Sequence, residues 1–439
     1  MDWQNRCARW AGRLGLAAAL AFGTAAHAQH ADKDAFRWVS AWGTAQQLAP
    51  QPAPKMPPPE VMARFKAMPK PPVSPIPPIP QQFSDQTLRM IARTSIAGNA
   101  VRVQLSNAAG AEPLVIAEAH LAKSASESRI DPASDHALTF GGQRSVTIEP
   151  GQIVASDPVE MAVPAFQDLA VSLYVPGAAK AATVHPLGLR TTYVAAGNAA
   201  AAPELASAQT NRSYFWLAGI DVRAAGDART IVAFGDSITD GFMTTPGASK
   251  AWPDLLAQRL HADPKTARWS VINMGIAGNR IRRDGAGLSA LARFDRDVLS
   301  RPGAGWMILL LGINDINMAA FPNPPEADKV TADQLITAYR QVIAKAHLHG
   351  VKVMGATILP TNGLWLYSDQ TEATRTAVNA WIRSSGEFDA VVDFDAVTRD
   401  PAQPNRLRPE FDPGDHVHPN DAGNAAMAKA IGLAVFARP

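Results

Sequence analysis

The sequence predicts two successive parts, an antiparallel β-sandwich-like domain over residues 29–225 and an α/β domain with a doubly wound parallel sheet over residues 226–439. Three observations support this division. The length of 439 residues exceeds what one hydrophobic core usually organises. Short strand-like runs with frequent turns fill the first part. Continuous apolar runs alternate with helical patterns in the second part.

The composition excludes several classes of protein before any motif is considered. With 47% hydrophobic residues the chain can bury sizeable cores. Its single cysteine, Cys7, excludes disulfides within the chain and cysteine-rich zinc modules. A formal net charge of +2 argues against a broad electrostatic surface for nucleic acid or anionic membranes. We therefore expect no nucleic-acid partner.

The first 28 residues have the pattern of an export signal. Three arginines form a basic start, residues 14–26 are apolar, and residues 26–28 place alanine at the two positions that a signal peptidase reads. We therefore expect cleavage after about Ala28 and an exported protein, either periplasmic or extracellular. The alternative is an uncleaved N-terminal anchor. No later stretch has the roughly 20 apolar residues that a membrane span needs.

Residues 50–80 interrupt the first domain with a proline-rich insertion. Its thirteen prolines lack backbone N–H donors and restrict φ, which excludes regular sheet and long helices. Val61, Phe65 and Met68 are spaced i, i+4, i+7 and predict one short amphipathic helix. The insertion is either a solvated surface loop or a lid whose apolar stripe covers an active site.

Around the insertion, residues 29–225 have the pattern of short strands joined by turns. In residues 101–105, valine and leucine alternate with Arg102 and Gln104, which is typical of a strand with one buried face. Glycine-containing turns separate the runs. Such a domain either binds carbohydrate or supports its neighbour. The other predicted strands are residues 37–44, 114–119, 145–148, 159–163, 169–175, 189–194 and 214–222.

The pattern changes near residue 225. Residues 230–234 form a continuous apolar run, as expected for a strand that is buried on both faces. Strands that alternate with helices predict right-handed crossovers and a parallel sheet, in which ligands bind beyond the carboxyl ends of the strands. The further predicted strands are residues 270–274, 306–311, 351–358 and 390–394, and the predicted helices are residues 252–260, 332–347, 371–383 and 421–436.

Candidate functional residues follow the first three of these strands. Ser237 ends a Gly-Asp-Ser segment at a predicted strand-to-helix turn, which presents its hydroxyl at the sheet edge. Asp236 and Asp240 are expected to cap turns. Gly278 lies in a glycine-containing loop after the second strand, and Asn314 lies in a Gly-Ile-Asn-Asp segment after the third. Each segment alone is also typical of an ordinary turn or helix cap.

Asp415 and His418 lie in the loop before the last predicted helix. A serine hydroxyl needs a base that removes its proton during attack, and a histidine oriented by a carboxylate can act as that base. Asp415 and His418 are therefore candidates to activate Ser237. The alternative is a metal site built from Asp415, His416 and His418, although no His-Glu-x-x-His motif accompanies these residues.

Taken in order, these four segments resemble the SGNH branch of the GDSL esterase and lipase family. The resemblance covers the second domain and implies a flavodoxin-like, doubly wound sheet. It implies that Ser237 is the nucleophile and that Asp415 and His418 complete the catalytic relay. It further implies an oxyanion hole made by the backbone N–H groups of Ser237 and Gly278 and the side-chain amide of Asn314. No metal or organic cofactor is implied.

The same resemblance implies a carboxylic ester hydrolase that works through an acyl-enzyme. Residues 38–44, Trp-Val-Ser-Ala-Trp-Gly-Thr, make the first domain similar to that of exported bacterial carbohydrate acetyl esterases, including those that act on acetylated xylan. We therefore expect a small-molecule or polysaccharide acyl ester as the substrate, and more narrowly an acetylated carbohydrate. The alternatives are a general short-chain carboxylesterase or lipase, and a carbohydrate-binding protein with an inactive hydrolase domain.

Overall fold

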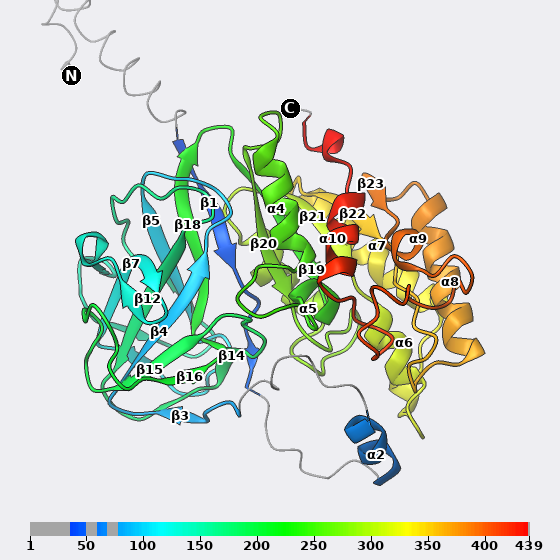
Figure 1. Cartoon of the computed structure of the whole chain (residues 1–439), viewed down its shortest axis with the longest axis horizontal. Coiled ribbons are helices and arrows are strands. Elements are labelled where there is room, and N and C mark those ends of the chain that lie inside the picture. The colour runs from blue at the N-terminus through cyan, green and yellow to red at the C-terminus, as the bar shows by residue number, and fades with distance from the viewer. Residues whose placement is uncertain (1–35, 50–58, 68–77, 438–439) are drawn as a thin grey trace, which may run out of the picture.

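The computed structural model describes residues 36–49, 59–67 and 78–437 (Figure 1). The predicted export signal at residues 1–28 lies outside the described residues, as does most of the proline-rich insertion. The helix predicted within the insertion is present as α2 (Pro59–Ala67). Among the described residues, no helix has the length and apolar character needed to cross a membrane.

The N-terminal half of the structure is an antiparallel β domain. One sheet has the strand order β1-β18-β5-β11, and a larger sheet has the order β16-β15-β4-β12-β7-β8 with β9 paired to β7. Buried apolar residues from both sheets form a single cluster, so the two sheets share one core. The bounds are β1 (Phe36–Gly43), β4 (Gln86–Arg93), β5 (Val101–Ser106), β7 (Glu118–Ser126), β8 (Arg129–Ile130), β9 (His136–Ala137), β11 (Ile153–Ala155), β12 (Asp168–Val175), β15 (Thr192–Ala196), β16 (Gln209–Asn211) and β18 (Leu217–Ala225).

Short strand pairs complete this half. In one of them β14 pairs with both β17 and β2, and it carries His185 at its end. The bounds are β2 (Gln47–Leu48), β3 (Gln82–Phe83), β6 (Leu114–Ile116), β10 (Val146–Ile148), β13 (Ala179–Lys180), β14 (Thr183–His185) and β17 (Tyr214–Phe215), with a short turn of helix at η1 (Pro132–Ser134).

The structure corrects two strand predictions. Residues 159–163 do not form a strand, because only isolated bridges join Val159 to Val101 and Val163 to Gly98. The central strand β4 was not predicted, because Arg89 interrupts its apolar sequence. The structure buries Arg89 completely and satisfies its guanidinium with Ser172 Oγ and with backbone carbonyls. A buried, fully hydrogen-bonded arginine has the same sequence signature as a solvated one.

The second half contains the predicted parallel sheet. Its strand order is β20-β19-β21-β22-β23, and every neighbouring pair is parallel. Gly235 at the end of β19 lies level with Gly275 on β20 and Leu310 on β21, so the loops after these strands begin side by side. The bounds are β19 (Arg229–Gly235), β20 (Trp269–Gly275), β21 (Ala304–Leu310), β22 (Lys352–Ala356) and β23 (Ala390–Val392).

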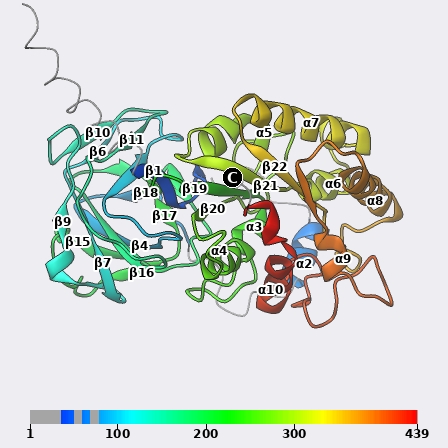
Figure 2. The same cartoon turned by 90° about the horizontal axis from the view of Figure 1, so that it is seen from above.

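Helices cover both faces of this sheet, which explains why its strands are apolar throughout. Figure 2 shows α5 and α7 on one face and α3, α4 and α10 on the other. The predicted helices are present, but the last ends at Ala430 and not at residue 436, because Gly432 and a separate turn follow. The bounds are α3 (Ser237–Asp240), α4 (Trp252–Ala262), α5 (Ala290–Phe294), η2 (Asp295–Leu299), α6 (Ile313–Ala319), η3 (Glu326–Asp328), α7 (Ala332–Leu348), α8 (Asp369–Ser384), α9 (Phe394–Thr398), α10 (Asp421–Ala430) and η4 (Leu433–Val435).

The two halves meet where β1 runs beside β20 (Figure 1). Ser270 Oγ donates to the carbonyl oxygen of Ser40 at 2.7 Å, and the backbone N–H of Val271 donates to Ser95 Oγ at 3.1 Å. Both bonds are buried. The β domain therefore packs directly against the edge strand next to β19, the strand that leads to Ser237.

Candidate active site

Ser237 begins α3 directly after β19. Gly235 permits the sharp turn, because a side chain there would collide with Thr239 and with the carbonyl oxygen of Leu310. Asp236 caps the helix as predicted, accepting a hydrogen bond from the N–H of Ile238 at 3.0 Å. Ser237 is thereby held at the carboxyl edge of the sheet with its backbone N–H at a helix start.

Asp415 and His418 approach Ser237 from the loop before α10. Ser237 Oγ lies 2.7 Å from His418 Nε2, and His418 Nδ1 lies 2.7 Å from Asp415 Oδ2. Because a carboxylate can only accept, Nδ1 carries the proton and Nε2 is free to accept the serine hydroxyl. The ring of Phe242 packs beside His418, with ring centroids 4.6 Å apart. The three residues form a continuous hydrogen-bonded chain.

Asp415 is ionised by its surroundings. Burial would raise its pKa, but the hydrogen bond and charge of His418, with the N–H groups of His418 and Val417, hold the pKa below its ordinary value. Those two N–H groups donate to Oδ1 at 3.0 and 3.1 Å. Asp415 can therefore orient the imidazole and stabilise its protonated form.

Gly278 and Asn314 lie on adjoining loops at the same sheet edge. Gly278, after β20, has a φ of 79°, and an added Cβ would come within 2.9 Å of the Ala286 Cβ. Asn314 lies in the first turn of α6, after β21, and its amide donates to the carbonyl oxygen of Asn279 at 3.0 Å. This bond ties the Asn314 loop to the residue after Gly278. The side-chain amide retains a second N–H that can bind a ligand oxygen.

His416 points elsewhere although it lies two residues from His418. Its Nδ1 is 2.6 Å from Asp412 Oδ2, and its side chain is 42% exposed. Among residues 36–49, 59–67 and 78–437, no group of three or more His, Cys, Asp or Glu has an arrangement that could hold a metal ion. The predicted residues Ser237, Asp415 and His418 are brought into contact, whereas the alternative set with His416 is not.

Two organising residues were missed by the sequence analysis. Arg293 on α5 is fully buried, and it donates to the carbonyl oxygens of Gly235 and Met274 and to Asn279 Oδ1 at 2.8–3.0 Å. It thus fixes the ends of β19 and β20. The prediction that Asp240 caps a turn is wrong, because its carboxylate instead contacts His185 of the β domain. In the sequence an arginine in a short helix and an aspartate after a turn carry no signal for these roles.

Asp236 should make stability depend on pH. Asp236 is 1% exposed, its Oδ2 has no partner among the described residues, and burial raises its pKa to about 7. The pKa of an unfolded aspartate is about 3.9. The folded protein therefore binds more protons, and its free energy of unfolding falls as the pH rises from about 4 to about 7.

Asp236→Asn should remove that component while keeping the cap for Ile238. As the pH rises from 4 to 7, the free energy of unfolding of the variant is expected to exceed that of the native chain by up to about 4 kcal/mol. This figure follows because the pKa shift of about three units corresponds to about 1.4 kcal/mol per unit. Urea unfolding of both proteins across this range measures the difference. Parallel stability curves for the two proteins would show that Asp236 ionises normally.

Comparison with protein families gives a match in the second half of the chain. Residues 231–431 match the family described as GDSL-like Lipase/Acylhydrolase. No curated protein gives a significant match to the chain.

Among solved structures, the chain is similar to the acetylxylan esterase Axe2 from Geobacillus stearothermophilus, with 22% identity over 48% of this chain and 95% of that one and a TM-score of 0.37. It is also similar to LAE5, an alpha/beta hydrolase from the metagenome of Lake Arreo, Spain. The identity is 22% over 48% of this chain and 96% of that one, and the TM-score is 0.37. A GDSL-like lipase from Bacteroides thetaiotaomicron shares 20% identity with this chain over 47% of this chain and 87% of that one, with a TM-score of 0.34.

On the family match, this chain is a carboxylic ester hydrolase whose residues 231–431 belong to the GDSL-like lipase/acylhydrolase family.

Proposed function

We propose that this protein hydrolyses carboxylic esters through an acyl-enzyme on Ser237 and that its substrate is an acetylated carbohydrate such as xylan. The observation that carries the catalytic part is the hydrogen-bonded chain from Ser237 through His418 to Asp415, with both distances at 2.7 Å. The residues lie at the carboxyl edge of a parallel sheet, where ligands of such sheets bind.

The proposed reaction uses only side chains and backbone of this chain. Ser237 Oγ attacks the ester carbonyl carbon while His418 Nε2 takes its proton, and Asp415 stabilises the resulting imidazolium. The oxyanion is held by the N–H groups of Ser237 and Gly278 and by the amide of Asn314. His418 then protonates the leaving alcohol. Water, deprotonated by His418, then attacks the acyl carbon. The bond from that carbon to Ser237 Oγ breaks, His418 returns the proton to Oγ, and the acid leaves. These steps require no metal or organic cofactor.

Asn314→Ala tests the oxyanion assignment. Loss of one oxyanion donor is expected to lower kcat about 100- to 1000-fold with a smaller change in KM, because the amide acts on charge that develops in the transition state. Asn314→Asp, which keeps the shape but removes the donor, should lose as much. Steady-state kinetics on p-nitrophenyl acetate measure both variants, and wild-type turnover in either would refute the role.

We also propose the finer division of the chain. The domains are the export signal at residues 1–28, a sandwich-like β domain at 29–225 and a doubly wound, flavodoxin-like hydrolase domain at 226–439. The apolar clusters support the boundary near residue 225. Among the described residues, one cluster runs from Val39 to Ala228, and another runs from Ile231 to Phe436 with Ala45 added. The strand order β20-β19-β21-β22-β23 corresponds to the flavodoxin-like order 2-1-3-4-5. Export, with cleavage after about Ala28, remains a prediction that the mass of the secreted chain tests.

A second candidate, a general short-chain carboxylesterase or lipase, is favoured by the position of α2. The guanidinium of Arg64 lies 5.6 Å from the ring centroid of Trp365, which follows β22. Helix α2 therefore lies near the carboxyl edge of the sheet, where a lid would have to lie (Figure 1). The same position is compatible with a surface loop that rests on the hydrolase domain.

A substrate panel separates the candidates. Acetate release from acetylated xylan is compared with hydrolysis of p-nitrophenyl acetate, butyrate and octanoate, with Ser237→Ala as the blank. The acetylated-carbohydrate proposal predicts the highest kcat/KM on acetylated xylan and a fall from acetate to octanoate. Preference for octanoate would identify a lipase. Hydrolysis of none of these esters would indicate a carbohydrate-binding protein with an inactive hydrolase domain.

A further inference from the structure

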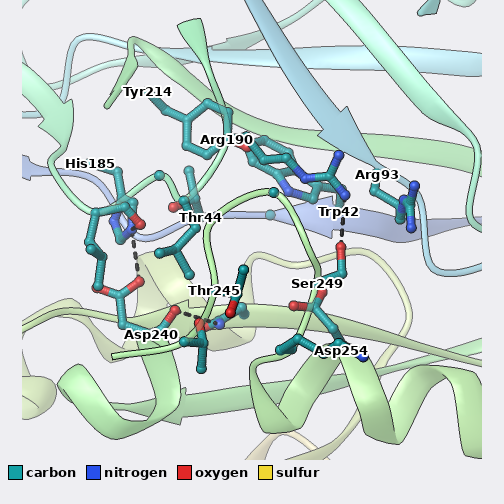
Figure 3. Close-up of a pocket in the computed structure, with 18 residues that line it drawn as sticks. Trp42, Thr44, Arg93, His185, Arg190, Tyr214, Asp240, Thr245, Ser249 and Asp254 are labelled. Atoms are coloured by element: carbon teal, nitrogen blue, oxygen red, sulfur yellow. Dashed lines mark hydrogen bonds and ion pairs between the residues drawn. The ribbon is translucent and has the colours of Figure 1, made fainter. Parts of the chain in front are cut away.

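His185 of the β domain reaches into the hydrolase domain and contacts the helix that carries Ser237. It lies at the end of β14 and is 3% exposed. Its Nε2 is 3.0 Å from Asp240 Oδ1, at the end of α3. Figure 3 shows this pair at one side of a cavity between the two halves of the molecule.

Both ring nitrogens of His185 face oxygen atoms. Nδ1 faces the carbonyl oxygen of Ala45 at 2.8 Å, and Nε2 faces Asp240 and, at 3.1 Å, the carbonyl oxygen of Leu187. The carbonyl oxygens can only accept, so Nδ1 carries a proton and donates to Ala45, while Nε2 and the carboxyl group of Asp240 share a hydrogen bond. Burial lowers the pKa of His185, but the charge of Asp240 and these hydrogen bonds raise it above its ordinary value. Burial raises the pKa of Asp240, and the two side chains form a buried hydrogen-bonded pair across the interface.

Asp240 connects the two loops that hold the proposed nucleophile and oxyanion donor. Its Oδ2 accepts a hydrogen bond at 3.1 Å from the backbone N–H of Ala277, the residue before Gly278. Asp240 itself belongs to α3, which begins at Ser237. One carboxylate therefore sets the position of the Gly278 loop relative to the helix of Ser237, and His185 fixes that carboxylate.

We propose that His185 and Asp240 are positioning residues of the esterase site, through which the β domain holds the Gly278 N–H in place for the oxyanion. The inference rests on the proposed function. A displacement of about 1 Å in such a group can cost about 100-fold in rate, although neither side chain touches the substrate. The β domain then contributes to catalysis as well as to any binding of substrate.

The alternative is that the pair only joins the two halves, and the same cavity offers a matched control. Arg190 Nη2 donates to Ser249 Oγ at 2.7 Å, which also links the β domain to the hydrolase domain (Figure 3). Ser249 lies between α3 and α4 and makes no hydrogen bond to the loops of Ser237 or Gly278 among the described residues. Ser249→Ala thus weakens the interface without reaching the site.

The test compares kcat, KM and the melting temperature of full-length Asp240→Asn, His185→Leu, His185→Gln and Ser249→Ala on p-nitrophenyl acetate. Asp240→Asn and His185→Leu are expected to lower kcat about 10- to 100-fold with little change in KM. His185→Gln should recover part of the loss, because its amide can still donate to Asp240. Ser249→Ala should keep the wild-type kcat.

Two outcomes overturn the proposal, and they differ from each other. If the native chain is active and requires Ser237, but Asp240→Asn and His185→Leu keep the kcat of Ser249→Ala, the pair has only a structural role. If the native chain hydrolyses no ester, the proposed function fails as well. Should His185→Leu not fold, the kcat of Asp240→Asn decides the matter.

Discussion

Ser237→Ala is expected to lower kcat for ester hydrolysis by about 10⁴- to 10⁶-fold. Alanine cannot form the acyl-enzyme, so only the oxyanion donors and substrate binding remain to accelerate attack by water. Loss of one hydroxyl from a residue that is 6% exposed leaves the strand-to-helix turn intact, because Gly235 and the Asp236 cap determine that turn. The melting temperature should therefore stay close to that of the native chain.

Steady-state kinetics on p-nitrophenyl acetate measure this fall in kcat. Ser249→Ala serves as a matched control, since it also removes one serine hydroxyl but lies outside the site. If Ser237→Ala kept wild-type turnover, the reaction would use another nucleophile, and the mechanism proposed above would be wrong.

His418→Ala is expected to cause a loss of similar size, about 10⁴- to 10⁶-fold in kcat. Without the imidazole, no base lies at hydrogen-bond distance from Ser237 Oγ, among the side-chain contacts that the structure describes. Asp415 then remains as a buried carboxylate with the N–H groups of residues 417 and 418 as its donors. Binding of substrate should change less than turnover, because His418 acts on a proton that moves during the reaction.

His416→Ala is the control for this variant. His416 lies in the same loop and is paired with Asp412 in the same way as His418 is paired with Asp415. Its removal should leave kcat near the native value. Equal losses in the two variants would indicate a general disturbance of the loop. A near-native kcat in His418→Ala would remove His418 from the role of base.

The sequence allows the parallel sheet and the contact between Ser237, Asp415 and His418 to be predicted because both depend on local patterns. A strand that is covered on both faces is apolar throughout, and parallel strands end at one edge, so polar residues directly after them converge. The same pattern predicts that Ser237, Gly278 and Asn314 lie on neighbouring loops. The Asp-x-x-His spacing brought a carboxylate and an imidazole into one short loop.

The errors arise where long-range packing overrides local pattern. Strand β4 was missed because Arg89 is buried and satisfied by groups 39–113 residues away in the chain. The role of Asp240 was missed for the same reason, since its partner His185 lies 55 residues earlier on a strand of three residues. No periodicity or motif marks such a pair, because each partner depends on how the two halves pack.

The most direct test of the central claim is to locate the residue that reacts covalently. The native protein is treated with an organophosphorus reagent, which modifies activated serines, and the digested product is analysed by mass spectrometry. The mechanism predicts one adduct, on Ser237, and none in Ser237→Ala. Absence of an adduct from the native protein, or an adduct that persists in the variant, would contradict the assignment of Ser237 as the nucleophile.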